Sequence, residues 1–116
     1  MKRVNPRVLI VESKKRVALE IKEMLHQYGY EVVGTAFTAK EAYKLAGKRN
    51  PDLILTNIEI QKEMDGIKLA EELSDKYMIP AVYMNFSKEA PAFDEKELLH
   101  RIELALSIRN EKNALV

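Results

Sequence analysis

Four polar side chains stand at the ends of apolar runs that are typical of buried strands: Glu12, Ser13, Asn57 and Asn85. The carboxyl ends of parallel strands meet at one edge of a sheet, where ligands of such sheets bind. We therefore expect these residues to line one pocket. Asn57 ends the most apolar of the runs, and its amide has neither a nucleophilic carboxylate oxygen nor a charge that would help to hold a metal.

Strand-like and helix-like segments alternate along the chain. Apolar, partly β-branched runs predict four strands, at 7–11, 31–36, 51–57 and 79–85. Apolar residues at helical spacing, with capping patterns before them, predict four helices that begin near Ser13, Thr38, Asp65 and Asp94. The last helix is expected to reach about Arg109, and 58–64 to form a loop. This alternation predicts right-handed βαβ units and a doubly wound parallel sheet of the α/β class.

The composition of residues 1–116 fits a single globular domain. Hydrophobic residues make up 47% and charged residues 32%, which is enough to build one core. A net charge of +1 gives no global electrostatic reason to expect nucleic acid or an anionic membrane as partner. No apolar run approaches the roughly 18 residues of a membrane span. The absence of cysteine excludes disulfides and fits a cytoplasmic protein.

Six short motifs, in this order and spacing, resemble the receiver domain of two-component response regulators. They cover residues 8–12, 29–34, 51–56, 64–67, 79–83 and 93–98. The resemblance extends from 8 to about 105 and implies a flavodoxin-like fold. It also implies a phosphorelay, in which phosphate passes from a kinase histidine to an aspartate at a strand end. Acidic neighbours of that aspartate hold Mg²⁺, which neutralises the phosphoryl oxygens.

Residue by residue, the resemblance transfers little of this chemistry. Glu12 matches the first acidic position, but Ser13 stands where a second acid is usual and Asn57 replaces the phosphoacceptor. Asn85 replaces the hydroxyl residue that ends the fourth strand. Lys88 is the candidate substitute for the family's lysine, although it lies in a short loop rather than at a strand end. One carboxylate in place of three predicts weak or absent Mg²⁺ binding, with Glu12 as the weak candidate ligand; no cofactor and no catalytic residue are expected.

The chain is also too short for the whole family fold. Eight residues separate Asn85 from Asp94, whereas a βαβ crossover needs about 10–12. We therefore expect the fourth helix and the fifth strand to be deleted, which leaves four strands in the order 2-1-3-4. The fourth strand becomes an edge, and the side chains expected to lose their cover there are Val82, Met84 and Phe86.

The last helix carries a second candidate partner surface. Leu104 and Ile108 fall outside the stripe of apolar residues that is expected to face the core. They are either part of an interface or ordinary exposed apolar residues. Together with the shortened sheet they lead us to expect a homodimer, in which exchange of the last helix is one arrangement.

Several pocket residues also have simpler interpretations. Glu12 is either a residual metal ligand or an acid favoured by the dipole of the first helix, and Ser13 is expected to cap that helix. Asn57 and Asn85 either bond across the pocket or face solvent. The basic run 14–16 is either a solvated face or a docking patch.

The leading hypothesis is a pseudo-receiver that is not an enzyme. It would act as a protein–protein interaction module in two-component signalling, without phosphorylation at the usual site. Its expected partners are a histidine kinase, another regulator or a second copy of itself. The alternative is a phosphoacceptor response regulator with weak phosphotransfer, or one in which Asn57 was engineered in place of aspartate. A small-ligand sensor is a third hypothesis, although no Gly-rich phosphate loop supports it.

Overall fold

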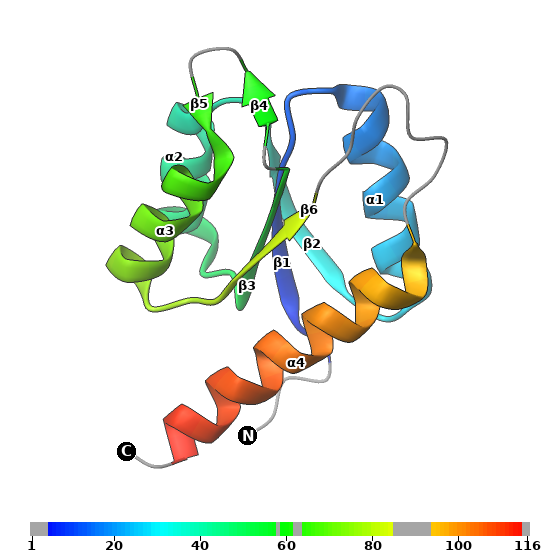
Figure 1. Cartoon of the computed structure of the whole chain (residues 1–116), viewed down its shortest axis with the longest axis vertical. Helices are drawn as coiled ribbons and strands as arrows, with labels where there is room; N and C mark the ends of the chain where they lie inside the picture. The colour runs from blue at the N-terminus through cyan, green and yellow to red at the C-terminus, as the bar shows by residue number, and fades with distance from the viewer. Residues whose placement is uncertain (1–4, 58, 62–63, 85–93, 115–116) are drawn as a thin grey trace.

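A four-stranded parallel sheet forms the centre of the molecule, with helices on both of its faces (Figure 1). The computed structural model describes residues 5–57, 59–61, 64–84 and 94–114, and only the backbone of 59–61, 64 and 109–114. The strands of this sheet are β1 (Arg7–Val11), β2 (Glu31–Ala36), β3 (Leu53–Asn57) and β6 (Ala81–Met84). Their spatial order is β2-β1-β3-β6, so the expected order 2-1-3-4 is confirmed.

Four helices occur in the described part of the chain: α1 (Lys15–Gln27), α2 (Ala39–Arg49), α3 (Gly66–Tyr77) and α4 (Glu95–Ala114). Short side chains before α2, α3 and α4 accept hydrogen bonds from backbone N–H groups of the first turn, which stabilises the start of each helix. Helix α4 continues past the expected end near Arg109 because no glycine or proline interrupts the residues that follow.

Helix α1 begins differently from the prediction. Its N-cap position is Lys14, and the Lys14 side chain makes no capping hydrogen bond. Ser13 lies one residue further out and is half-buried. The expectation that Ser13 caps α1 is therefore wrong, since the chain turns into the helix one residue later than the capping pattern predicts.

The direction of chain travel decides which helices cover which face. The crossover from β2 to β3 and that from β3 to β6 both run toward the β6 edge, and right-handed connections therefore place α2 and α3 on the same face. The crossover from β1 to β2 runs the other way, which places α1 on the opposite face. Helix α4 packs on β6 and β3 and shares the face of α1. Side chains of alternate strand residues fill the two cores that result.

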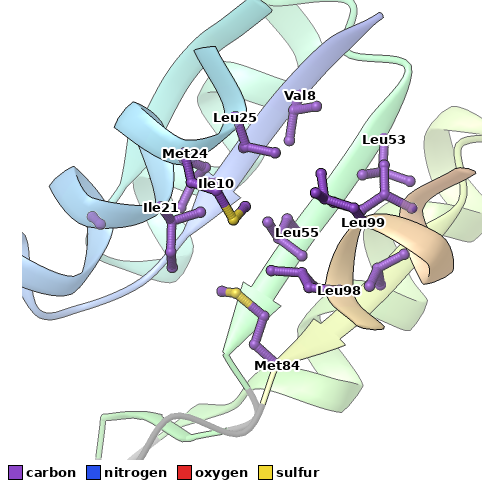
Figure 2. Close-up of a cluster of buried hydrophobic side chains, with 13 residues drawn as sticks. Val8, Ile10, Ile21, Met24, Leu25, Leu53, Leu55, Met84, Leu98 and Leu99 are labelled. Atoms are coloured by element: carbon purple, nitrogen blue, oxygen red, sulfur yellow. The ribbon is translucent and has the colours of Figure 1, made fainter. Parts of the chain in front are cut away.

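Helix α4 buries the face of β6 that was expected to be uncovered. Val82 and Met84 are only 4% and 5% exposed, and both belong to the core beneath α1 and α4. Figure 2 shows Met84 pointing toward Leu55 and Leu98. The prediction that Val82 and Met84 form a partner surface is therefore wrong. In the family fold, the crossover after the fourth strand runs in the same direction as the crossover that contains α3. Its helix would therefore cover the α3 face of β6, and Tyr83 lies on that face.

A second, small sheet replaces part of the loop expected at 58–64. Strands β4 (Glu59–Gln61) and β5 (Met64–Asp65) pair in antiparallel fashion. They lie at the same end of the molecule as the carboxyl end of β3 (Figure 1). The alternation of polar and apolar residues in 59–61 is a strand pattern, but at three residues it is too short to distinguish from a loop.

Candidate functional site: a buried polar pair at the carboxyl end of the sheet

Glu12 and Asn57 meet at the end of the two central strands. The side-chain nitrogen Nδ2 of Asn57 donates a hydrogen bond of 2.8 Å to Oε1 of Glu12. The second carboxylate oxygen of Glu12 accepts a longer bond of 3.4 Å from the backbone N–H of Lys14. Both side chains are closed off from solvent, since Glu12 is 0% and Asn57 1% exposed.

The parallel ladder brings these two residues together. Val11 lies opposite Thr56 in the register of β1 and β3, and Glu12 and Asn57 are the next residue of each strand path. The backbone N–H of Glu12 also donates to the carbonyl of Ala36 at the end of β2, at 2.9 Å. Glu12 is therefore bonded to both neighbouring strands, through its backbone to β2 and through its side chain to Asn57 of β3.

An amide suits this position for an electrostatic reason. A carboxylate without solvent is costly to bury unless donors satisfy its oxygens. Glu12 is an acceptor when it is ionised, and the amide nitrogen of Asn57 is a donor, so the two groups are complementary. An aspartate at position 57 would set two carboxylates against each other in the absence of a cation. The amide of Asn57 therefore partners the buried side chain of Glu12 without adding a second carboxylate beside it.

The pocket does not fit Mg²⁺ as a receiver would bind it. Hard cations need several charged oxygens, and among the described residues that the site brings together Glu12 supplies one carboxylate, which is already bonded to an amide. Within the described ranges, no three His, Cys, Asp or Glu side chains come together in a way that could hold a metal ion. Ser13 is half-buried beside the pocket and adds no charge. Asn85, Phe86 and Lys88 lie outside the described residues, so the expectations for them stay predictions.

Interactions with the fold account for much of the basic run 14–16. The ammonium group of Lys15 lies 5.7 Å from the ring centre of Phe37, and Arg16 pairs with Glu20 at 3.7 Å. Both interactions are exposed, of the kind that contributes little to stability. They favour the interpretation of this run as a solvated helix face.

Two surfaces outside the pocket are open. Leu104 and Ile108, on α4, are 50% and 52% exposed, as the helical spacing predicts. A hollow of about 330 Å³ lies between α3 and the edge strand β6, lined by Glu71, Ser74, Asp75, Ala81 and Tyr83. Sequence reasoning missed this hollow because it assigned the lost cover to the wrong face of β6. The alternation along 81–84, combined with the handedness of the missing crossover, could have identified it.

Comparison with known proteins identifies the class. Residues 8–103 match the family described as the response regulator receiver domain. The transcriptional regulatory protein PdtaR of Mycobacterium tuberculosis is 35% identical over 95 residues, which cover 82% of this chain and 43% of PdtaR. The fold and the pocket position agree with this match. The chain belongs to the response regulator receiver domain family.

Solved structures agree with the assignment. The response regulator PhyR from Brucella abortus superposes with a TM-score of 0.83 at 26% identity, over 98% of this chain and 53% of that one. PhyR from Bartonella quintana, described as an anti-anti-sigma factor, gives a TM-score of 0.83 at 23% identity over 99% and 53% of the two chains. The chain thus spans about half the length of these regulators or less. Among the helices of the described residues, none has the length and apolarity needed to cross a membrane.

Proposed function

We propose that this domain is a pseudo-receiver: a signalling module that acts through protein contacts and is not phosphorylated at the usual site. The observation that carries this proposal is the buried hydrogen bond between Asn57 and Glu12. It occupies the position of the phosphoacceptor with an amide and uses the remaining carboxylate as that amide's partner. The absence of a second acid at Ser13 supports the same conclusion.

Partners of the proposed module are proteins of a two-component pathway in the cytoplasm, such as a histidine kinase or another regulator. One relative supports a role in such a pathway, because PhyR from Brucella abortus is described as a response regulator. The nearly balanced charge of +1 favours protein partners over nucleic acid. A homodimer built on Leu104 and Ile108 is part of the same proposal, since both are exposed on one side of α4.

A phosphorylation assay tests the pocket directly. The protein is incubated with acetyl phosphate and Mg²⁺, and the phosphorylated fraction is measured by intact-mass spectrometry. Beryllofluoride with Mg²⁺, followed by NMR, gives a second readout that does not depend on a stable phosphoryl bond. An unrelated receiver domain with a complete acidic site serves as positive control. We expect the control to react and this domain to stay unmodified in both assays.

The variant N57D separates this proposal from the alternative of weak or engineered-out phosphotransfer. If only the amide blocks an otherwise working site, N57D becomes phosphorylated and binds Mg²⁺. We expect no stoichiometric modification of N57D, because Ser13 still leaves the site one acid short of the family's set. Stoichiometric, Mg²⁺-dependent modification of the parent would overturn the proposal, and modification of N57D alone would favour the alternative, in which only the amide blocks a working site.

A further inference from the structure

The hollow beside β6 lies where the receiver fold normally continues. Figure 1 shows α3 alongside β6, and the two elements are in contact. The hollow of about 330 Å³ between them is lined by three residues of α3 and two of β6. Ala81 and Tyr83 form its floor and are only half-buried, whereas Val82 and Met84 on the other face are covered by α4. Apart from α3, no helix of the described residues covers this face of β6.

The lining of this hollow is acidic. Glu71 and Asp75 are exposed, stand one helical turn apart on α3, and face the same side as Ser74. None of the five lining residues is basic. Burial, and then the carboxylates of Glu71 and Asp65, raise the pKa of the Tyr83 phenol. The tyrosine therefore lies within the field of negative charges at this edge, and a cationic group would be attracted there.

The backbone of β6 also directs hydrogen-bonding groups outward along the same edge. The N–H of Ile54 donates to the carbonyl of Pro80, and the ladder continues from Ile54 opposite Ala81 to Asn57 opposite Met84. Backbone groups of alternate strand residues point to the same neighbour, so those of Val82 and Met84 face β3. Those of Ala81 and Tyr83 face outward, and in the described part of the chain no strand pairs with β6 on that side.

We propose that this edge binds an extended, basic segment of a partner protein, which adds to the sheet beside β6 and places lysine or arginine side chains over the hollow. Strand addition uses the outward backbone groups for affinity, and alternate side chains for specificity. On the α3 face these side chains would reach Glu71 and Asp75. On the other face they would lie at the rim of the core that contains Val82 and Met84, where apolar side chains fit. The matching segment therefore alternates basic and apolar residues.

This inference deepens the proposed role in protein contacts, and it rests on that role for its biological meaning. Its test does not depend on phosphorylation. A fluorescein-labelled nine-residue peptide that alternates lysine and valine is titrated with the domain, and anisotropy is followed. A peptide that alternates glutamate and valine is the control ligand. We expect saturable binding of the basic peptide with a Kd below about 1 mM, and no saturation with the acidic one.

Three variants locate the site. E71K/D75K reverses the charge of the hollow and should weaken binding by about tenfold or more. E20K/E23K makes the same change in net charge on the exposed side of α1, and should stay within about twofold of the parent. A81P removes an outward N–H from the edge strand, where proline is tolerated, and should also weaken binding by about tenfold or more. Circular dichroism and thermal unfolding verify that each variant is folded.

Each result supports or overturns the proposal. Selective loss in E71K/D75K and in A81P supports it. Equal loss in both charge-reversal variants would identify nonspecific attraction and overturn it. Unchanged affinity of A81P would overturn strand addition, and so would failure of the parent to saturate. None of these results changes the expected outcome of the acetyl phosphate assay, so the two proposals fail separately.

Discussion

At the carboxyl end of β3, a buried hydrogen bond joins two polar side chains. The amide nitrogen of Asn57 donates it to the carboxylate of Glu12 at 2.8 Å, and both side chains are closed to solvent. In a phosphorylatable receiver the same place needs negative oxygens that a cation draws together. Here the amide donor of Asn57 and the carboxylate acceptor of Glu12 satisfy each other. The amide is therefore part of a stable arrangement and not merely a missing nucleophile.

N57D should destabilise the domain. The variant places a second carboxylate about 3 Å from that of Glu12, without solvent to screen the repulsion. We expect the free energy of unfolding at pH 7, measured by urea denaturation without divalent ions, to fall by about 2–4 kcal/mol. The loss should shrink at lower pH, because protonation of one carboxyl group removes the repulsion.

The matched control is N50D, which makes the same chemical change at the exposed end of α2. It should cost only a few tenths of a kcal/mol, from an added charge near the carboxyl end of a helix. Equal stability of N57D and the parent protein at pH 7 would show that the Asn57–Glu12 bond does not hold the pocket together.

Tyr30 should make stability fall at alkaline pH. Burial, and then the carboxylate of Glu103, raise the pKa of its phenol. Below the unfolded pKa of about 10 the hydroxyl is protonated in both states, so the contribution is fully present. As the pH rises further, the Tyr30 phenol ionises first in the unfolded chain, because its pKa is lower there. The contribution of Tyr30 to stability is therefore lost as the pH rises through its pKa in the folded state. Urea unfolding between pH 9 and 11 should show a shallower decline for Y30F.

Tyr28 supplies the control for this measurement, because it is two residues away and 52% exposed. Y28F should follow the parent protein over the same pH range. An identical decline in Y30F and the parent would mean that Tyr30 does not contribute to the alkaline loss.

The elements show how far the sequence alone leads. Apolar runs and capping patterns locate all four strands of the main sheet and all four helices, and strand ends bring Glu12 and Asn57 to one pocket. The bond between them was not predicted, since only Asn85 was considered as a partner for Asn57. The cover of Val82 and Met84 was also missed. It depends on the long-range packing of α4 across β6 and β3, which local periodicity does not encode.

I102A should test the packing of α4. Ile102 is 0% exposed and belongs to the core that also contains Val82 and Met84. Removing its side chain should lower the free energy of unfolding by about 2–4 kcal/mol, through lost burial and the cavity left behind. L104A, on the same helix but at a 50% exposed position, is the control and should cost less than about 1 kcal/mol. Similar small losses for both variants would contradict the placement of α4 on the sheet.

At the scale of the whole molecule, the expected deletion of the family's fourth helix and fifth strand affects the two faces of β6 differently. Helix α4 covers one face of β6, and on the opposite face an acidic hollow lies beside an edge that pairs with no other strand of the described residues. The molecule is elongated, with extents of 42 × 28 × 19 Å, and the carboxyl end of α4 projects away from the sheet (Figure 1). Two separate regions are thereby available for contacts: the β6 edge and the outer side of α4.

The outer side of α4 should mediate self-association. Leu104 and Ile108 stand four residues apart, face the same way and are both about half exposed, so pairing them with a second copy would bury apolar area. We expect sedimentation velocity between about 10 and 300 μM to show a shift from monomer to dimer, since so small a patch implies a Kd on the order of 10–100 μM. L104E should keep the protein monomeric, because a charge would enter the interface. L19E makes the same kind of change at a 56% exposed leucine of α1 and should dimerise as the parent does. A parent protein that stays monomeric at 300 μM, or an equal effect of L19E and L104E, would contradict a dimer built on α4.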